Sequence, residues 1–399
     1  MRRFIIIAAV ILGGTLTATA QKKDIATARE QVQKGTSLDK AEQSMLKLLK
    51  DSANRENTKI WTTMFDALLK QYEQGNEKLY LKQKYDTTAL FGIASRMFIQ
   101  MEAFDSIDAR PDKKGRVRPA YRKQHAELLN KLRPNLLNGG LFYVRKQKWN
   151  EAYALLDQYI STASRPLFTA YKYHETDRRL PSAAYWAVYC AYKLGDSKRT
   201  LHHTYLALKD TAHFEVMLQY LAETYQRDGD IERCITTLRE GFDRYPCSPY
   251  FYAHLLDYYS SRKDYDQALK LTDEALRTTC DKRGFWIAKS SLLLNMGDNE
   301  GCFQICDSLI QLKDSTAEVF LNAGLARFNE GVLLDKTVKP TARQKKQIVD
   351  YYRTALPYLE TYRRLRPDAK DKWGLPLYTI YLNLNMGKEF EEVDRILNG

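Results

Sequence analysis

The chain has 399 residues, and its 62 Lys and Arg against 49 Asp and Glu give a formal net charge of +13. It is rich in Tyr (27) and has few Gly and Pro (19 and 11), and it lacks long strand-like alternation of apolar and polar residues. This composition favours a helical array over a β-sheet protein. No stretch beyond the first 20 residues is apolar enough over about 20 residues to span a bilayer.

The first 20 residues have the three parts of a secretory leader. Arg2 and Arg3 precede the apolar run Phe4–Leu12, and Ala18 and Ala20 form a small-residue cleavage site. We therefore expect a signal peptide over 1–20, cleaved after Ala20, and a periplasmic or secreted mature chain without a transmembrane segment. An uncleaved N-terminal anchor is the alternative.

Residues 21–110 are predicted to form degenerate helical hairpins. Ser37–Lys50 and Thr58–Tyr72 have the pattern of repeat helices, and Asp86–Ile107 is predicted to be a longer amphipathic helix. The apolar face of that longer helix is formed by Leu90, Ile93, Met97 and Met101.

Residues 111–180 are predicted to hold one hairpin, a basic linker and an insertion. The linker, Arg110–Pro119, combines Pro, Gly and like charges that oppose a helix, and it is the best candidate boundary. Lys148–Ile160 is predicted to be the second helix of the hairpin, and Gly139 and Gly140 lie in its partner. About 14 further residues are inserted around Ser164–Pro181, judged against the repeat downstream.

A 34-residue period runs through residues 181–331. Gly195, Gly229, Lys263 and Gly297 stand at equivalent predicted turns, and Gly331 falls on the same grid. The repeat that begins at Glu215 has the following large and small residues in phase: Leu218, Leu221, Ala222, Tyr225, Cys234, Leu238, Gly241 and Pro246. The next two repeats place Tyr252, Leu255, Ala268, Ala275 and Trp286 in the same way.

This pattern resembles the tetratricopeptide repeat (TPR) family. The resemblance implies an all-α fold, a right-handed α-solenoid of about seven to eight helical hairpins, in which stacking supplies the core. Residues 332–399 are predicted to form C-terminal TPR-like hairpins with a basic insertion around 333–347. The frame resumes with Ala355 at the small-residue position.

The resemblance also implies a concave binding groove lined by the first helix of each repeat. The residues at these positions are Tyr185, Tyr189, Tyr192, Gln219, Glu223, Gln226, Tyr250 and Asp257. Tyrosine suits contacts with a peptide or a glycan. Packing between helices is the alternative for each tyrosine. The set does not match the Lys and Asn clamp of chaperone-binding TPR domains.

Cysteines at Cys302 and Cys306 raise the question of a redox pair, a metal half-site or packing. On the repeat grid both face the partner helix, where cysteine acts as a small apolar residue. Residues four apart on a helix are too distant for an easy disulfide. Packing is therefore expected, and Cys247 and Cys280, in turns between repeats, are the only pair considered for a disulfide.

We find no motif for catalysis, a cofactor or a metal. No phosphate loop, H-E-x-x-H or G-x-S-x-G is present. His202 and His203 are adjacent and are expected to point to different sides of a helix. We therefore expect a non-catalytic periplasmic scaffold that binds a protein or peptide, in envelope assembly or secretion. The alternatives are a glycan- or glycolipid-binding envelope protein and an enzyme framed on a helical array.

Basic stretches occur in three places, at 110–123, 339–346 and 362–367. An acidic envelope component would suit them as a partner, whereas export argues against nucleic acid. A solvated surface that promotes solubility is the alternative.

Overall fold

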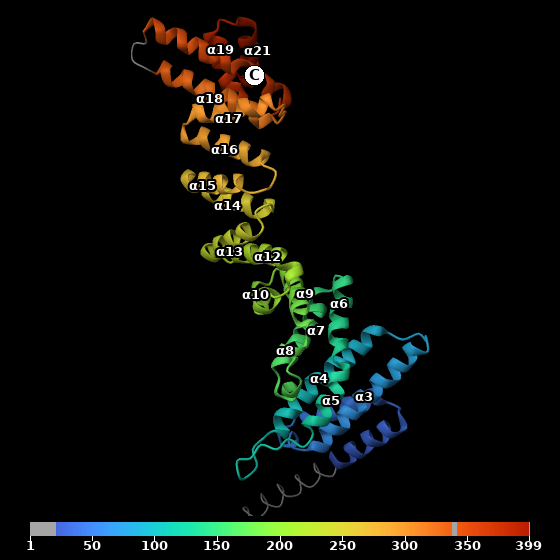
Figure 1. Ribbon diagram of the computed structural model, residues 1–399. Coiled ribbons are helices and arrows are strands. Elements are labelled where there is room, and N and C mark those ends of the chain that lie inside the picture. Colours follow the sequence, from blue (N-terminus) through green and yellow to red (C-terminus); the bar gives the residue numbers. More distant parts are fainter. Residues whose placement is uncertain (1–20, 337–340, 399) are drawn as a thin grey trace, which may run out of the picture. The chain divides into compact units, whose positions relative to one another are not determined.

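The computed structural model describes residues 21–336 and 341–398, so the predicted leader and its cleavage site lie outside the described residues (Figure 1). Within this part of the chain the regular elements are all helices, which confirms the all-α prediction. The chain divides into two compact units, Met1–Gly229 and Asp230–Gly399. This division falls inside the predicted regular array, and the basic segment 110–119 is a loop of the first unit. The finer segment boundaries stay predictions.

The first unit contains a helix over 21–34 and then α2 to α12, with short 3-10 turns between some of them. The helices are α2 (Leu38–Leu49), α3 (Thr58–Tyr80), α4 (Thr87–Asp108), α5 (Arg122–Leu132), α6 (Pro134–Arg145), α7 (Trp149–Ser161), α8 (Tyr173–Thr176), α9 (Leu180–Lys193), α10 (Ser197–His202), α11 (Thr204–Ala207) and α12 (Phe214–Arg227). The 3-10 turns are η1 (Ser52–Asn54), η2 (Thr162–Ser164), η3 (Pro166–Tyr171) and η4 (Thr211–His213). One continuous apolar core extends from Ile25 to Met217.

The second unit contains α13 and four hairpins. Its helices are α13 (Ile231–Arg244), α14 (Pro249–Ser261), α15 (Tyr265–Leu276), α16 (Arg283–Met296), α17 (Asn299–Gln311), α18 (Ala317–Asp335), α19 (Ala342–Leu365), α20 (Lys370–Asn383) and α21 (Gly387–Asn398). Together with α2/α3, α6/α7 and α9/α10 of the first unit, seven hairpins lie within one unit or the other in the described part of the chain. Gly229 joins α12 to α13 at the division between the units, and counting this pair gives eight, in line with the predicted seven to eight. No described helix combines the length and the apolarity that crossing a membrane requires.

Each regular hairpin turns on one residue in the left-handed region of φ. Gly195, Gly229, Lys263 and Gly297 have φ values of 70°, 75°, 60° and 84°. The residue that follows is always an aspartate, and its carboxylate accepts a hydrogen bond from a backbone N–H in the first turn of the next helix. These N-caps are Asp196, Asp230, Asp264 and Asp298. The 34-residue period therefore fixes both the end of one helix and the start of the next.

Gly331 does not make a fifth turn, so that prediction is wrong. It lies inside α18, which continues to Asp335. A Cβ at this position would lie 2.6 Å from Cε1 of Tyr352 on α19, so the glycine permits close packing of the two helices. The repeat frame is lost here because α18 and α19 are longer than the regular helices.

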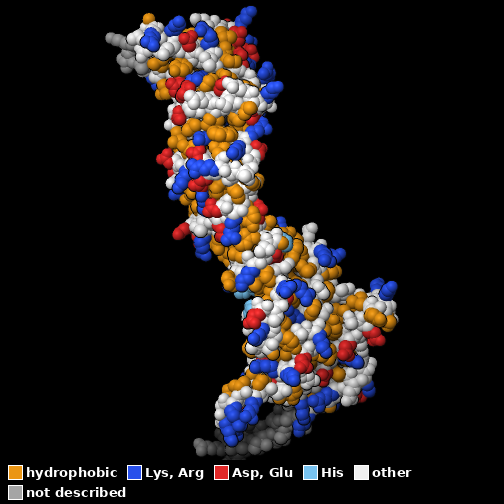
Figure 2. Space-filling view, viewed as in Figure 1, with side chains coloured by type: hydrophobic (Ala, Val, Ile, Leu, Met, Phe, Trp, Pro, Cys, Tyr) orange, Lys and Arg blue, Asp and Glu red, His pale blue; other side chains and the backbone are white. Residues whose placement is uncertain are grey.

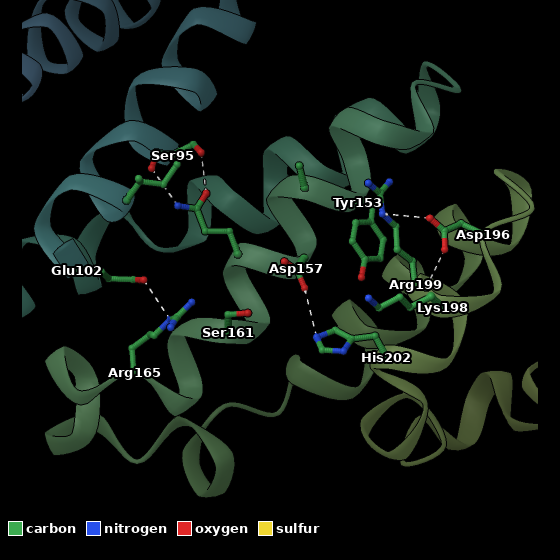
Figure 3. A pocket seen from close by; sticks show the side chains of 13 residues that line it. Ser95, Glu102, Tyr153, Asp157, Ser161, Arg165, Asp196, Lys198, Arg199 and His202 are labelled. Carbon is green, nitrogen blue, oxygen red and sulfur yellow. Dashed lines mark hydrogen bonds and ion pairs between the residues drawn. The ribbon is translucent and has the colours of Figure 1, made fainter. Parts of the chain in front are cut away.

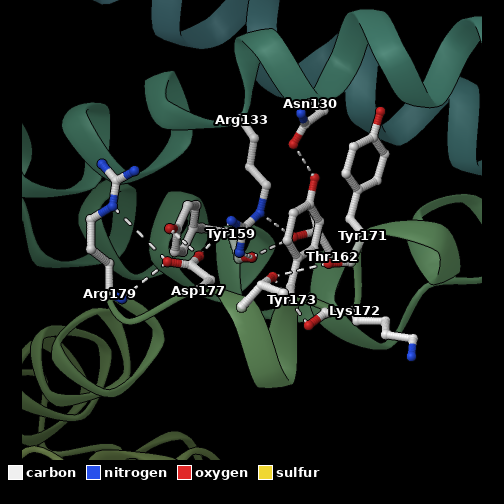
Figure 4. Close-up of polar contacts among 10 residues, drawn as sticks. Asn130, Arg133, Tyr159, Thr162, Tyr171, Lys172, Tyr173, Asp177 and Arg179 are labelled. Carbon is white, nitrogen blue, oxygen red and sulfur yellow. Dashed lines mark hydrogen bonds and ion pairs between the residues drawn. The ribbon is translucent and has the colours of Figure 1, made fainter.

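The insertion predicted around Ser164–Pro181 forms η2, η3 and α8, and a buried arginine holds it against the hairpin α6/α7 (Figure 4). The side chain of Arg133 is 6% exposed, and its guanidinium lies 3.8 Å from the ring centroids of both Tyr159 and Tyr173. It donates hydrogen bonds to Asp177 at 2.5 Å and to Thr162 at 2.8 Å. The buried charge is therefore paired, and each of its three nitrogens donates a hydrogen bond, the third to the Tyr159 carbonyl.

Hydrogen bonds also determine the pKa of Asp177, the carboxylic acid of this network. Burial alone would raise the pKa of Asp177, but hydrogen bonds from Tyr159 and Arg133 hold it below the usual range. The carboxylate therefore stays ionised opposite the guanidinium.

The cysteines confirm the packing prediction. Cys302 and Cys306 are free and fully buried on α17, and the Cys302 thiol donates to the backbone carbonyl of Asn322 at 3.7 Å. A hydrogen bond with Cys306, together with burial, raises the pKa of the Cys302 thiol far above its usual range. Cys247 and Cys280, in contrast, form a disulfide with their Cα atoms 5.3 Å apart.

Candidate functional site

The three tyrosines predicted to line a groove form part of an aromatic cluster between α9 and α12. Tyr185 is 6% exposed, and its ring stacks on His213 with centroids 3.9 Å apart. Tyr192 stacks on Tyr220 at 4.3 Å, and its hydroxyl donates to the carboxylate of Glu223. Tyr185 therefore packs between helices, which was the alternative to a role in a groove. The contacts of Tyr192 with Tyr220 and Glu223 extend the same cluster.

Tyr189 is half-buried in the cluster. Its ring centroid lies 5.6 Å from that of Trp149 and 6.1 Å from that of Tyr220. Gln219 is also half-buried, whereas Gln226 is exposed on α12. The role of these residues in partner binding stays a prediction.

Tyr250 and Asp257 lie on α14 in the second unit, where the ring of Tyr250 packs 4.3 Å from that of His254 and Asp257 is exposed. The eight predicted residues are thus divided between the two units. Of these, the structure brings Tyr192 on α9 to Glu223 on α12, and Tyr185 stacks beside Tyr189. Gln219 and Gln226 also lie on α12, and no hydrogen bond joins them to the three tyrosines among the described residues.

A different region of the first unit has a cleft with a volume of about 670 Å³ (Figure 3). We call it the α4–α7–α10 cleft. Ser95, Ile99 and Glu102 come from α4, and Asp196, Lys198, Arg199 and His202 come from α10 and its cap. The remaining residues are Tyr153, Ala154, Asp157, Gln158 and Ser161 on α7, and Arg165 just after η2.

Hydrogen bonds fix α4 to α7 at the floor of this cleft. The Ser95 hydroxyl donates to the side-chain oxygen of Gln158 at 2.7 Å, and the amide nitrogen of Gln158 donates to the Ser95 carbonyl at 2.9 Å. Ile99, one turn along α4, is 53% exposed. The cleft thus places an accessible apolar side chain on a fixed helical frame.

The charged groups of the cleft are mostly paired with one another. Arg165 lies 3.1 Å from Glu102, and Arg199 lies 3.3 Å from Asp196. Lys198 is exposed and has no ion-pair partner among the described residues. The cleft therefore offers one unpaired cation next to paired charges and an apolar side chain.

Burial changes the acidity of two groups in the cleft. Desolvation raises the pKa of Glu102 to about 6, although Arg165 opposes this rise. Desolvation also raises the pKa of Tyr153 to about 12. By contrast, a hydrogen bond from His203 holds the pKa of Asp157 below its usual range.

The expectation that His202 and His203 point to different sides of a helix is wrong. Both rings face Asp157, with nitrogen-to-oxygen distances of 4.0 and 2.7 Å, and their centroids are 4.4 Å apart. The cause is local, because α10 ends at His202 and His203 leaves the helical conformation with φ −106° and ψ 14°.

The basic segment 110–118 is exposed between α4 and α5, in the lower part of the view in Figure 2. Arg116 pairs with Asp112 at 2.8 Å, whereas Lys113 and Lys114 have no ion-pair partner among the described residues. An acidic partner for this surface stays a prediction.

No sequence signal could have revealed the α4–α7–α10 cleft, since its residues extend from Ser95 to His202 and carry no motif. The aspartate N-caps were missed for a different reason. Asp196, Asp230, Asp264 and Asp298 recur every 34 residues beside the glycine grid, and their period would have identified them.

Hairpins of two helices that recur every 34 residues, with small buried residues such as Ala268 at the helix contact, decide the type of fold. The chain has an all-α helical-repeat fold with the 34-residue period that is typical of tetratricopeptide repeats. No family model matches the sequence, and no curated protein matches it.

Solved structures do match, at low identity. One is the C-terminal part of a TPR repeat-containing protein from Cytophaga hutchinsonii, with 11% identity, a TM-score of 0.38 and coverage of 64% of this chain and 98% of that chain. Another is pilF of Pseudomonas aeruginosa, with 16% identity, a TM-score of 0.33 and coverage of 61% and 96%. The TPR domain of P58(IPK) has 11% identity, a TM-score of 0.27 and coverage of 94% and 98%. Such similarities concern the fold and bear on no function.

Proposed function

We propose that the chain is a non-catalytic scaffold of the bacterial periplasm that binds a segment of a partner protein in the α4–α7–α10 cleft. Helical-repeat arrays bury their apolar faces by stacking and leave extended surfaces for binding. In this chain we assign the binding surface to the α4–α7–α10 cleft.

The observation that carries the proposal is the lining of the cleft. Its volume of about 670 Å³ is enough for several side chains. Ile99 offers an apolar contact, and Lys198 offers a cation without an ion-pair partner in the described part of the chain. A partner segment with an apolar side chain beside a carboxylate would match both groups.

Two features support the periplasmic location. Residues 1–20 have the composition of a secretory leader. The disulfide between Cys247 and Cys280 is of a kind that persists in oxidising compartments.

Site-specific photo-crosslinking in cells tests the proposal. A benzoylphenylalanine at Ile99 should form an adduct with a protein, and Lys198→Glu should reduce its yield because it reverses the charge that meets the partner. The matched control is the same photo-crosslinker at Tyr80, which is 84% exposed on α3 and does not line the cleft. No protein adduct at Ile99, or equal adducts at both positions, would contradict the proposal. An adduct with carbohydrate alone would favour the glycan-binding alternative.

A further inference from the structure

We propose that Asp157, His202 and His203 form a binding site for one divalent transition-metal ion of the Zn²⁺ type. The site lies at one side of the α4–α7–α10 cleft and includes Asp157 and His202 of its lining, but the metal proposal does not rest on the proposed partner binding. Two imidazoles and one carboxylate are a ligand set that zinc takes in proteins, with a fourth position left for water.

The positions of the donor atoms carry this proposal. One ligand atom of each residue lies within 4.8 Å of the others. Zinc bonds of 2.0–2.2 Å at tetrahedral angles place ligand atoms roughly 3.3 Å apart. The Asp157–His203 pair, at 2.7 Å, is closer than this, and His202, at 4.0 Å from Asp157, is farther.

To bind a metal ion, the ring of His202 must move closer to Asp157 and His203, and this side chain is free enough to do so. The side chain of His202 is 62% exposed, so its ring can rotate toward the other two ligands without disturbing the core. His203 is 9% exposed, and its position beside Asp157 is already set by packing. Metal binding replaces the hydrogen bond between them, and His203 then carries its proton on Nδ1.

Most charged groups of the cleft are paired, and Lys198 is the one that opposes a bound cation. Two guanidiniums of the cleft each have a carboxylate of their own, since Arg165 pairs with Glu102 and Arg199 with Asp196. Asp157 is the carboxylate of the cleft that has no Arg or Lys within ion-pair distance among the described residues (Figure 3). Its only described ion-pair partners are the two imidazoles.

The break between α10 and α11 gives the site its geometry. In a continuous helix, neighbouring side chains point about 100° apart, so two adjacent histidines would not share one ligand. Because His203 leaves the helical conformation, both rings turn toward α7.

Metal titration of the exported chain, purified without a polyhistidine tag and stripped with chelator, tests the proposal. The probes are Co²⁺, whose visible absorption reports tetrahedral coordination, and Zn²⁺, which should displace it at one ion per chain. Mg²⁺ and Ca²⁺ should not compete, since they prefer oxygen ligands. His202→Ala should weaken binding by about tenfold or more, because even outer-shell changes weaken metal sites by 10–100-fold.

Two further variants make the result decisive. Asp157→Asn should also weaken metal binding. His174→Ala should leave metal binding unchanged, because His174 is an exposed histidine outside the site that forms a hydrogen bond with Ser164. Circular dichroism verifies that each variant is folded. Absence of stoichiometric Zn²⁺ binding, or an unchanged affinity in folded His202→Ala, would overturn the proposal and leave Asp157–His203 as a structural hydrogen bond.

Discussion

At the scale of single residues, Lys263 stands where three other regular turns of the array have glycine. Its φ of 60° is in the left-handed region, which disfavours residues with a side chain by about 1–2 kcal/mol. Glycine relieves this strain but loses more backbone entropy on folding. Lys263→Gly should therefore raise the free energy of unfolding of the second unit by about 0.5–1 kcal/mol, as measured by urea denaturation.

The matched control for this change is the reverse one at Gly297, whose φ is 84°. Gly297→Ala should lower the free energy of unfolding by about 1 kcal/mol. Nothing lies within 4 Å of a Cβ at this position, so steric contact cannot explain a loss. If Lys263→Gly is less stable than the wild-type protein, the Lys263 side chain stabilises the fold by more than the strain of its backbone conformation destabilises it.

Glu102 gives the first unit a specific pH dependence. Its folded-state pKa of about 6 is higher than the ordinary 4.5, so the folded protein binds the proton more tightly than the unfolded chain. The contribution of Glu102 to stability is therefore greatest below pH 4.5 and declines as pH rises through about 6, by about 1–2 kcal/mol. Glu102→Gln should remove this decline in urea melts measured from pH 4.5 to 7.5.

Arg165 and Asp105 are the charged groups that act on Glu102, and they serve as controls. Arg165 lowers the pKa of Glu102 and Asp105 raises it. Arg165→Gln should therefore steepen the decline. If the wild-type protein and Glu102→Gln show the same pH dependence, folding does not raise the pKa of Glu102 and the prediction is wrong.

At the scale of elements, the aromatic cluster joins α9 to α12. We expect Tyr185→Ala to lower the free energy of unfolding by about 3 kcal/mol, since it removes a buried ring that stacks on His213. Tyr192→Phe removes only the hydrogen bond to Glu223 and should cost about 1–2 kcal/mol. Thermal and urea melts measure both. A folded Tyr185→Ala of unchanged stability would favour the groove interpretation over packing.

The helices were well predicted where they depend on contacts within one hairpin. Ala268 and Cys302 were placed at the small-residue position, and both are fully buried. Gly140 was placed in the partner helix of α7, and the structure shows that α6 and α7 approach closely there, since a Cβ would lie 2.6 Å from Leu156. Gly331 misled the same reasoning, because glycine serves both turns and helix contacts, and the sequence spacing does not distinguish them.

At the scale of the whole molecule, the disulfide between Cys247 and Cys280 stabilises the second unit. It joins turns 33 residues apart, so in the chain-entropy description it contributes about 3–4 kcal/mol. The double change Cys247→Ser with Cys280→Ser should lower the free energy of unfolding of this unit by that amount. Denaturant melts in oxidising and reducing buffer measure it, and the variant should no longer respond to reductant.

Thiol counting provides the control for this prediction. Of the six cysteines, four are free, so the denatured, unreduced protein should react at four thiols. Cys234→Ala, at a buried free cysteine, should reduce this number by one and keep the response to reductant. Six reactive thiols in the exported protein would contradict the disulfide.

The sequence by itself determined the helical hairpins, their 34-residue period, their turns and the small residues at their contacts. These features depend on neighbours within one hairpin or the next, so they recur along the chain and can be recognised there. It also singled out Cys247 and Cys280, because both lie in turns between repeats.

Only the tertiary structure decided which side chains meet across helices distant in the sequence. Ser95 and Gln158 are 63 residues apart, and Arg133 and Asp177 are 44 apart. No spacing rule relates such pairs, because their contact depends on the lengths of α4 and α7 and on the insertion between α7 and α9. The meeting of Asp157 with His202 and His203 has the same origin. This contact requires that α10 end between His202 and His203, and the repeat pattern did not indicate a helix end there.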